Sequence, residues 1–127
     1  MNSDDDPKKL LGQSKKEYAK FLEKQDVDIL AEAGELLWES LKAHLEQETN
    51  TKTNSFQTLT KIAARMGERF NTLFFHCYHF HSWYSGVGVP NDFPAEKKLY
   101  LESAKSFEKI ISKGKIRPKK REIEKAT

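Results

Sequence analysis

The hydrophobic positions along the chain recur with the period of an α-helix, and polar stretches divide them into four segments. The first helix is expected from about Pro7 or Ser14 to Gln25. Its apolar side chains share one face: Leu11, Tyr18, Phe21 and Leu22. The second helix follows Asp26, a residue type that suits an N-cap, and runs to about Thr49. Its apolar stripe places a glycine among four leucines: Leu30, Gly34, Leu37, Leu41 and Leu45.

A polar stretch over residues 48–55 contains no apolar side chain and is expected to form a loop. A long third helix is predicted from about Ser55 to Ser85, because two glycines and a proline in residues 86–92 then break the pattern. On a helical wheel, one tight stripe of this helix is predicted to face the core: Leu59, Ala63, Met66, Phe70, Leu73, Cys77 and Tyr84.

The fourth helix is expected to begin near Phe93 and Pro94, since proline suits the first helical turn, and to end at Gly114. Its predicted buried face comprises Tyr100, Ala104, Phe107 and Ile111. No alternating strand pattern competes with these helices. The sequence therefore predicts an all-α, antiparallel up-and-down bundle of four helices, with five as the alternative. The bundle is expected over residues 1–113, followed by a basic, flexible tail over 114–127.

Composition narrows the class of protein further. A length of 127 residues suits one domain. Cys77 is the single cysteine, so no internal disulfide can form, and a reducing cytoplasmic location is expected. The acidic N-terminal segment has no apolar core of the kind that secretory signals carry. The most apolar stretch, residues 73–80, is too short to cross a bilayer, so no membrane association is predicted.

The net charge of +3 is too small to identify a partner, but the basic residues concentrate near the C-terminus. Residues 113–121 include Lys119, Lys120 and Arg121, which are candidates for contacts with nucleic-acid phosphates. The alternative is a solvated, charged chain end without a ligand.

The third predicted helix carries a second row of side chains about 100° from its core stripe. The row is mixed polar and aromatic: Thr58, Arg65, Arg69, Thr72, His76 and Trp83. Arg69 and His76 are two turns apart and so point in the same direction. An arginine can hold a phosphate and a histidine can transfer a proton near neutral pH. These two are the candidate catalytic residues of a metal-independent ribonuclease, with Arg65 as a further phosphate contact.

Two other interpretations of the same segment stay open. Arg69 could bond a loop carbonyl or a glutamate of the second helix, and His76 could be a satisfied residue at the margin of the core. His76 and His79 are also spaced to chelate one ion, with His44 as a distant further ligand. His81 points about 140° away from His76, so the three histidines cannot meet on one ion. No metal site and no cofactor are predicted, and Cys77 is expected to be a buried, unreactive thiol.

Two stretches of the chain resemble a known family. Residues 18–38, with the run AGELLW at Ala33–Trp38, look like the opening helices of archaeal paREP-type proteins. A later aromatic and histidine-containing segment, FHSWY at Phe80–Tyr84, leads into a last helix as it does in those proteins. They belong to the higher-eukaryote-and-prokaryote nucleotide-binding (HEPN) superfamily, and the resemblance covers about residues 14–113.

The resemblance implies a bundle of four to five helices that is frequently a homodimer. Ribonucleases of the superfamily carry arginine, four to six residues, then histidine, which Arg69 and His76 match at six. Many members instead have Asn, Asp or His directly after the arginine, where this chain has Phe70. Other members bind nucleotides, act as antitoxins, or pair with nucleotidyltransferases.

Three functions are therefore expected in order. The first is a HEPN-like domain that binds nucleic acid, a nucleotide or a protein partner. The second is a toxin-like, metal-independent endoribonuclease that uses Arg69 and His76. The third is a structural protein-interaction module. Whether the chain is an enzyme is left open by the residues.

Overall fold

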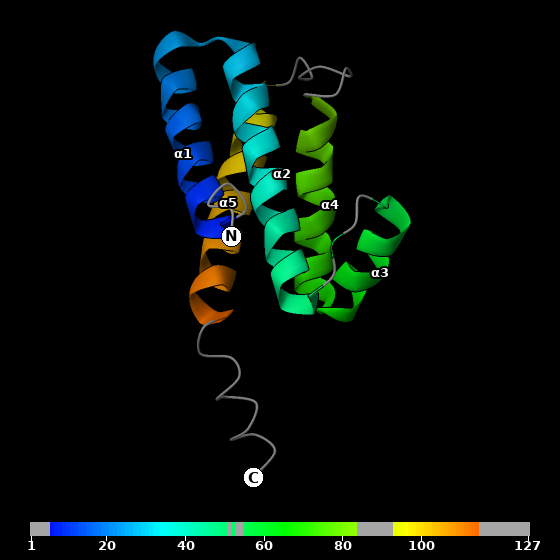
Figure 1. Cartoon of the computed structure of the whole chain (residues 1–127). Helices are drawn as coiled ribbons and strands as arrows, with labels where there is room; N and C mark the ends of the chain where they lie inside the picture. Colours follow the sequence, from blue (N-terminus) through cyan, green and yellow to red (C-terminus); the bar gives the residue numbers. More distant parts are fainter. Residues whose placement is uncertain (1–5, 51, 53–54, 84–92, 115–127) are drawn as a thin grey trace.

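The computed structural model describes residues 6–50, 52, 55–83 and 93–114 (Figure 1). Within these ranges the protein is all-α, with five helices and no strand. This agrees with the predicted fold class. None of the helices in the described part of the chain is long and apolar enough to cross a membrane.

Helices α1 (Pro7–Lys24) and α2 (Val27–Thr49) form an antiparallel pair joined by a two-residue connection. Asp6 caps α1, and its side chain accepts a hydrogen bond from the backbone N–H of Lys8 at 3.0 Å. Asp26 caps α2 in the same way, as predicted. Between the helices Gln25 adopts a left-handed conformation, with φ of 57°, which ends α1 and turns the chain.

The predicted long third helix is wrong, because the chain forms two helices over that range. They are α3 (Phe56–Arg65), which Ser55 caps, and α4 (Glu68–Ser82). The break falls at Gly67, whose φ of +110° is a conformation that L side chains rarely adopt. The helical spacing of apolar residues continues across Gly67, so the hydrophobic pattern gives no sign of the break. In Figure 1, α3 leans away from α4 at one end of the molecule, while α4 lies beside α2.

Helix α5 (Phe93–Gly114) lies beside α1, α2 and α4, and it buries the four side chains predicted for it. The predicted faces of α2 and of residues 59–77 are also buried, except that Met66 is only partly covered. Tyr84 and Ser85, predicted for the third helix, lie outside the described residues. The core therefore joins side chains from all five helices.

The predicted face of α1 needs one correction. Leu22 is 49% exposed, whereas Ser14 is fully buried. The Ser14 hydroxyl lies 2.6 Å from both the carbonyl oxygen of Ala33 and the hydroxyl of Tyr100, so it joins three helices. A buried hydroxyl is tolerated when it is hydrogen-bonded in this way, and the buried face of α1 is consequently rotated away from Leu22.

Helices α2 and α4 approach each other closely at Gly34. A Cβ atom at this position would lie 2.8 Å from Cβ of Phe80 and 3.0 Å from Cε3 of Trp83. Both distances are shorter than ordinary van der Waals contact, so only glycine fits here without displacement. The glycine within the leucine stripe of α2 is thus a packing requirement and holds α4 against α2.

Candidate functional site

A groove of about 770 Å³ runs between α4 and α5 and is open to solvent. Residues of α4 and α5 line it: Glu68, Arg69, Thr72, Leu73, His76, Glu102, Ser103, Ser106, Lys109 and Ile110. The two candidate catalytic residues, Arg69 and His76, therefore share one cavity, as their spacing on α4 predicts.

Arg69 and His76 differ in exposure but share one property. Arg69 is exposed, and His76 is partly buried on the wall of the groove. Neither side chain forms a hydrogen bond or an ion pair with another described residue. The interpretation that Arg69 bonds a carbonyl or a glutamate of α2 therefore finds no support within the described part of the chain. No residue of the described ranges therefore occupies either side chain.

The opposite wall, which sequence reasoning missed, comes from α5. Ser103 is only 3% exposed, and its hydroxyl has no hydrogen-bond partner among the described residues. Ser106 and Lys109 are exposed farther along the same face. The signal was a polar row at spacings of three residues beside the apolar stripe of α5. This row could not be assigned to a site from the sequence, because only the fold places it opposite Arg69.

The charges of the groove are balanced. Arg69 and Lys109 supply two positive charges, whereas Glu68 and Glu102 supply two negative ones. A continuous basic track, which binds long polyanions, is therefore absent from this groove. The arrangement instead offers a local anion site with carboxylates nearby that can accept hydrogen bonds from hydroxyl or amino groups.

A second hollow of about 380 Å³ adjoins the groove and shares Arg69 and Ile110 with it. Its remaining lining residues are Glu48, Thr49, Met66 and Phe70. Phe70, the residue that departs from the superfamily pattern after the arginine, is buried as the helical wheel predicted. Arg69 thus stands between a polar compartment and a more apolar one.

Arg65, a further predicted phosphate contact, does not join this groove. Arg65 is exposed on α3 and lines neither hollow, because the break at Gly67 separates it from Arg69. The predicted row on the third helix is accordingly discontinuous, and its last member, Trp83, is buried in the core. Lys119, Lys120 and Arg121 lie outside the described residues.

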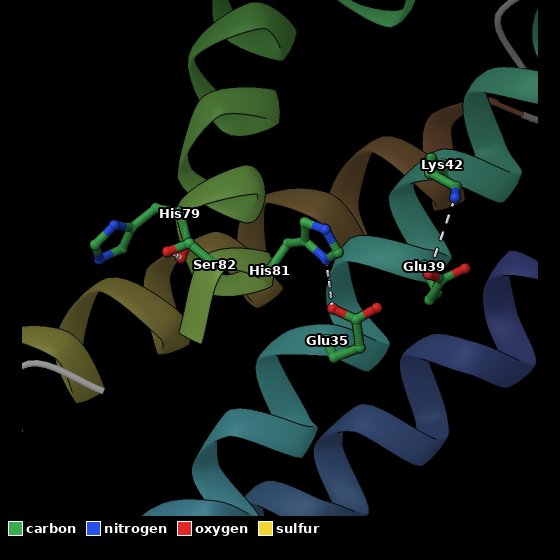
Figure 2. A network of polar contacts seen from close by, with 6 residues as sticks. All are labelled: Glu35, Glu39, Lys42, His79, His81 and Ser82. Carbon is green, nitrogen blue, oxygen red and sulfur yellow. Dashed lines mark hydrogen bonds and ion pairs between the residues drawn. The ribbon is translucent and has the colours of Figure 1, made fainter. Parts of the chain in front are cut away.

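The remaining histidines of α4 contact carboxylates of neighbouring helices. The Nδ1 atom of His81 lies 2.7 Å from Oε1 of Glu35 on α2. Figure 2 marks this contact with a dashed line. The His81 ring also stacks on Trp38, with ring centroids 5.4 Å apart. On another side of α4, Nε2 of His79 lies 2.9 Å from Oε1 of Glu96 on α5. These contacts attach the end of α4 to two other helices.

The environment of Glu35 raises the pKa of its carboxyl group. Burial is the largest cause, and nearby Glu39 acts in the same direction. His81 opposes both effects by hydrogen bonding and by charge. The net shift is upward because desolvation disfavours the carboxylate form.

Cys77 and the candidate metal ligand His44 are buried, and they line neither the groove nor the hollow beside it. Burial raises the pKa of the Cys77 thiol far above its ordinary value, so the thiolate does not form near neutral pH. His44 is buried between the rings of Phe70 and Phe107, at centroid distances of 6.0 and 5.7 Å. Across the described ranges, no three His, Cys, Asp or Glu side chains lie close enough to hold a metal ion.

No family model, no curated protein and no solved structure matches the chain significantly. The fold and the groove therefore define its class as an all-α protein with an open polar groove between two helices. Any narrower assignment depends on the side chains described above.

Proposed function

We propose that this protein is a HEPN-like helical bundle that binds a phosphate-bearing ligand, RNA or a nucleotide, in the groove between α4 and α5. Two observations support the bundle assignment. The helices α1, α2, α4 and α5 lie side by side, and α1 and α2 run in opposite directions. The observation that carries the ligand assignment is that Arg69 and His76 line one open groove without partners among the described residues.

Arg69 is the phosphate anchor in this proposal. Its planar guanidinium can donate two parallel hydrogen bonds to phosphate oxygens, and it forms no ion pair with a carboxylate of the described chain. Lys109 adds a second positive charge from α5. His76 lies on the same wall of the groove, where its imidazole can donate to the ligand or exchange a proton with it.

Metal-independent cleavage of RNA is the second candidate, favoured by the position of His76 beside Arg69. His76 would accept the proton of a ribose 2′-hydroxyl, whose oxygen then attacks the adjacent phosphorus. The bond from phosphorus to the 5′-oxygen breaks, and that oxygen takes a proton from water. The products are a 2′,3′-cyclic phosphate and a 5′-hydroxyl, and Arg69 stabilises the charge on the phosphoryl oxygens.

The proposal includes a homodimer, and the exposed rings on α3 and α4 support it. Phe56, Phe75 and Tyr78 are 40%, 45% and 37% exposed. The rings of Phe56 and Tyr78 pack at a centroid distance of 4.3 Å and so form a continuous apolar surface. Such surfaces are typical of protein interfaces. Sedimentation of the purified chain tests this part, and a monomer at all concentrations would remove it. A nucleotidyltransferase or antitoxin partner remains a proposal from the resemblance alone.

One experiment separates binding from cleavage. Mixed RNA is incubated in EDTA with the wild-type protein, with His76→Ala and with Arg69→Ala, and both retention and cleavage are measured. Arg69→Ala is expected to weaken binding at least about tenfold, because it removes a charge-assisted contact. Arg65→Ala is the matched control, since Arg65 is an exposed arginine that lines neither hollow.

The outcomes assign the function. Binding without cleavage supports a binding domain, whereas cleavage that His76→Ala abolishes supports the endoribonuclease. Equal affinity in the wild type and Arg69→Ala would reject the groove as the phosphate site.

A further inference from the structure

The groove and its neighbouring hollow suit two chemically different parts of one ligand. The larger compartment, of about 770 Å³, carries the charged and hydroxyl groups. The smaller one, of about 380 Å³, is the more apolar of the two, because Met66, Phe70 and Ile110 line it beside Glu48 and Thr49. Both volumes fall in the range of about 300–1,000 Å³ that small-molecule sites usually occupy. Arg69 and Ile110 belong to both linings, so the two compartments adjoin at these residues.

We infer that the groove takes one phosphate group of a small phosphorylated ligand, held between Arg69 on α4 and Ser103 with Lys109 on α5, while a flat ring of the same ligand enters the apolar hollow beyond Arg69. This inference rests on the function proposed above. It adds the α5 half of the site, the place of the ring, and the size of the ligand.

Ser103 is the residue that points to a ligand on α5. The residue is only 3% exposed, yet its hydroxyl lacks a partner among the described residues. A buried hydroxyl without a hydrogen bond is costly, and most such groups in proteins are paired. Because Ser103 lines the groove, we infer that its hydroxyl, which is closed off from solvent in this structure, turns toward the groove and donates a hydrogen bond to a ligand oxygen. Lys109 lies six residues farther along α5 and lines the same groove.

The acidic residues of the groove favour a small ligand over a long polyanion. Glu68 and Glu102 would repel the successive phosphates of an extended RNA strand. With a single phosphate on Arg69 and Lys109, the same carboxylates are free to accept hydrogen bonds from sugar hydroxyls. The flat ring then packs against Met66 and Ile110, where an adaptable thioether side chain can follow its shape.

Calorimetric titration of the full chain tests this inference with four probes. Adenosine 5′-monophosphate carries both a phosphate and a ring, ribose 5-phosphate lacks the ring, and adenosine lacks the phosphate. A single-stranded uridine oligonucleotide represents the polyanion. We expect the mononucleotide to bind more tightly than ribose 5-phosphate or adenosine, and also more tightly per site than the oligonucleotide.

Variants on α5 test the second half of the site. Ser103→Ala and Lys109→Ala are each expected to weaken mononucleotide binding about tenfold, the effect of losing one hydrogen bond to a charged group. Lys105→Ala is the matched control, because Lys105 is exposed on α5 and does not line the groove. Ser103→Ala should leave the unfolding temperature unchanged or raise it, since the hydroxyl has no internal partner to lose.

A variant of the apolar hollow tests the place of the ring. Met66→Gln keeps the length of the side chain and makes it polar. It should weaken the binding of the mononucleotide about fivefold and leave the binding of ribose 5-phosphate unchanged, as expected when apolar contact with the ring is lost.

Each remaining outcome is decisive. Equal binding of ribose 5-phosphate and the mononucleotide would overturn the ring compartment. Unchanged affinity in Ser103→Ala and Lys109→Ala would overturn the α5 half. Tight binding of the oligonucleotide without binding of the mononucleotide would overturn this inference while leaving the proposed function intact. If no phosphate-bearing probe binds, both fail.

Discussion

Near the C-terminal end of α4, His79 and His81 each bond a carboxylate of a neighbouring helix, whereas earlier on the same helix Arg69 and His76 line an open groove. The residue types overlap, but their surroundings do not. His79 and His81 meet Glu96 and Glu35, which α5 and α2 bring to them. No described residue offers Arg69 or His76 such a partner. One end of the helix is therefore engaged in packing, and the other presents unused polar groups.

This difference indicates how α4 can be fixed in the fold at one end and present ligand-binding side chains along the rest of its length. The close contact of Gly34 with Phe80 and Trp83 sets the position of α4 against α2. The histidine contacts then restrain the helix on two sides. Arg69 and His76 lie one to three turns along α4 from this anchored end. The helix is therefore held in place without using their hydrogen-bonding groups. The following predictions test this division of α4 into an anchored end and an open groove.

The largest effect is expected at the close approach of α2 and α4. Gly34→Ala should lower the free energy of unfolding by about 1–3 kcal/mol, because its Cβ overlaps Phe80 and Trp83 in a packed core. Gly12→Ala is the matched control in α1, where a Cβ meets nothing within 4 Å. It should raise stability by up to about 1 kcal/mol through helix propensity. Denaturant unfolding measures both, and equal effects would contradict the anchoring role of Gly34.

The next largest effect is a difference in stability between His81→Ala and His76→Ala. His81→Ala removes the contact with Glu35 and the stacking on Trp38, so we expect a loss of about 1–2 kcal/mol in unfolding free energy. His76→Ala removes no internal hydrogen bond among the described residues and should change stability by less than about 0.5 kcal/mol. The same unfolding experiment compares them. A larger loss in His76→Ala would show that its role is structural and would argue against the groove as a site.

A smaller effect is expected in the pH dependence of stability. The pKa of Glu35 is raised above its ordinary value of 4.5, so the folded state retains this proton at pH values where the unfolded state has released it. The stability that Glu35 contributes is thus fully present below about pH 4.5 and is lost as the pH rises through the raised pKa. Glu35→Gln should remove this dependence while keeping a hydrogen-bonding group beside His81.

Unfolding free energies of the wild type and Glu35→Gln across the acid range check this sign. The difference, wild type minus variant, should fall as the pH rises. Glu32→Gln, on the exposed face of α2, is the control and should follow the wild-type curve. A difference that rises with pH would mean that the pairing with His81 outweighs burial at Glu35.

Much of the fold was predictable from the order of residues. The boundaries of α1, α2 and α5 follow from local signals: Asp6 and Asp26 as caps, Pro94 in a first turn, and Gly114 at a helix end. The break at Gly67 was missed because a lone glycine occurs within many helices, and only its φ of +110° ends one. Leu22 was misplaced because its wheel position suits the core, whereas the hydrogen bonds of Ser14 set the face of α1 that is buried.

Only the α4 half of the candidate site could be predicted from the sequence. Arg69 and His76 share a helix, so a period of 3.6 residues suffices to place them together. Ser103 and Lys109 lie more than 25 positions farther along the chain, and no periodicity relates them to Arg69. The pairing of His81 with Glu35, 46 positions apart, was hidden in the same way.

The sequence alone determined α1, α2 and α5, the cap of α2 and most of the buried faces, because those depend on interactions between residues a few positions apart. The tertiary structure decided which polar groups are used and which remain available. It joined His79 and His81 to carboxylates, placed α5 opposite Arg69, and left the buried hydroxyl of Ser103 unpaired within the described chain. A local pattern specifies which way a side chain points, but its partner comes from another helix and is set by packing.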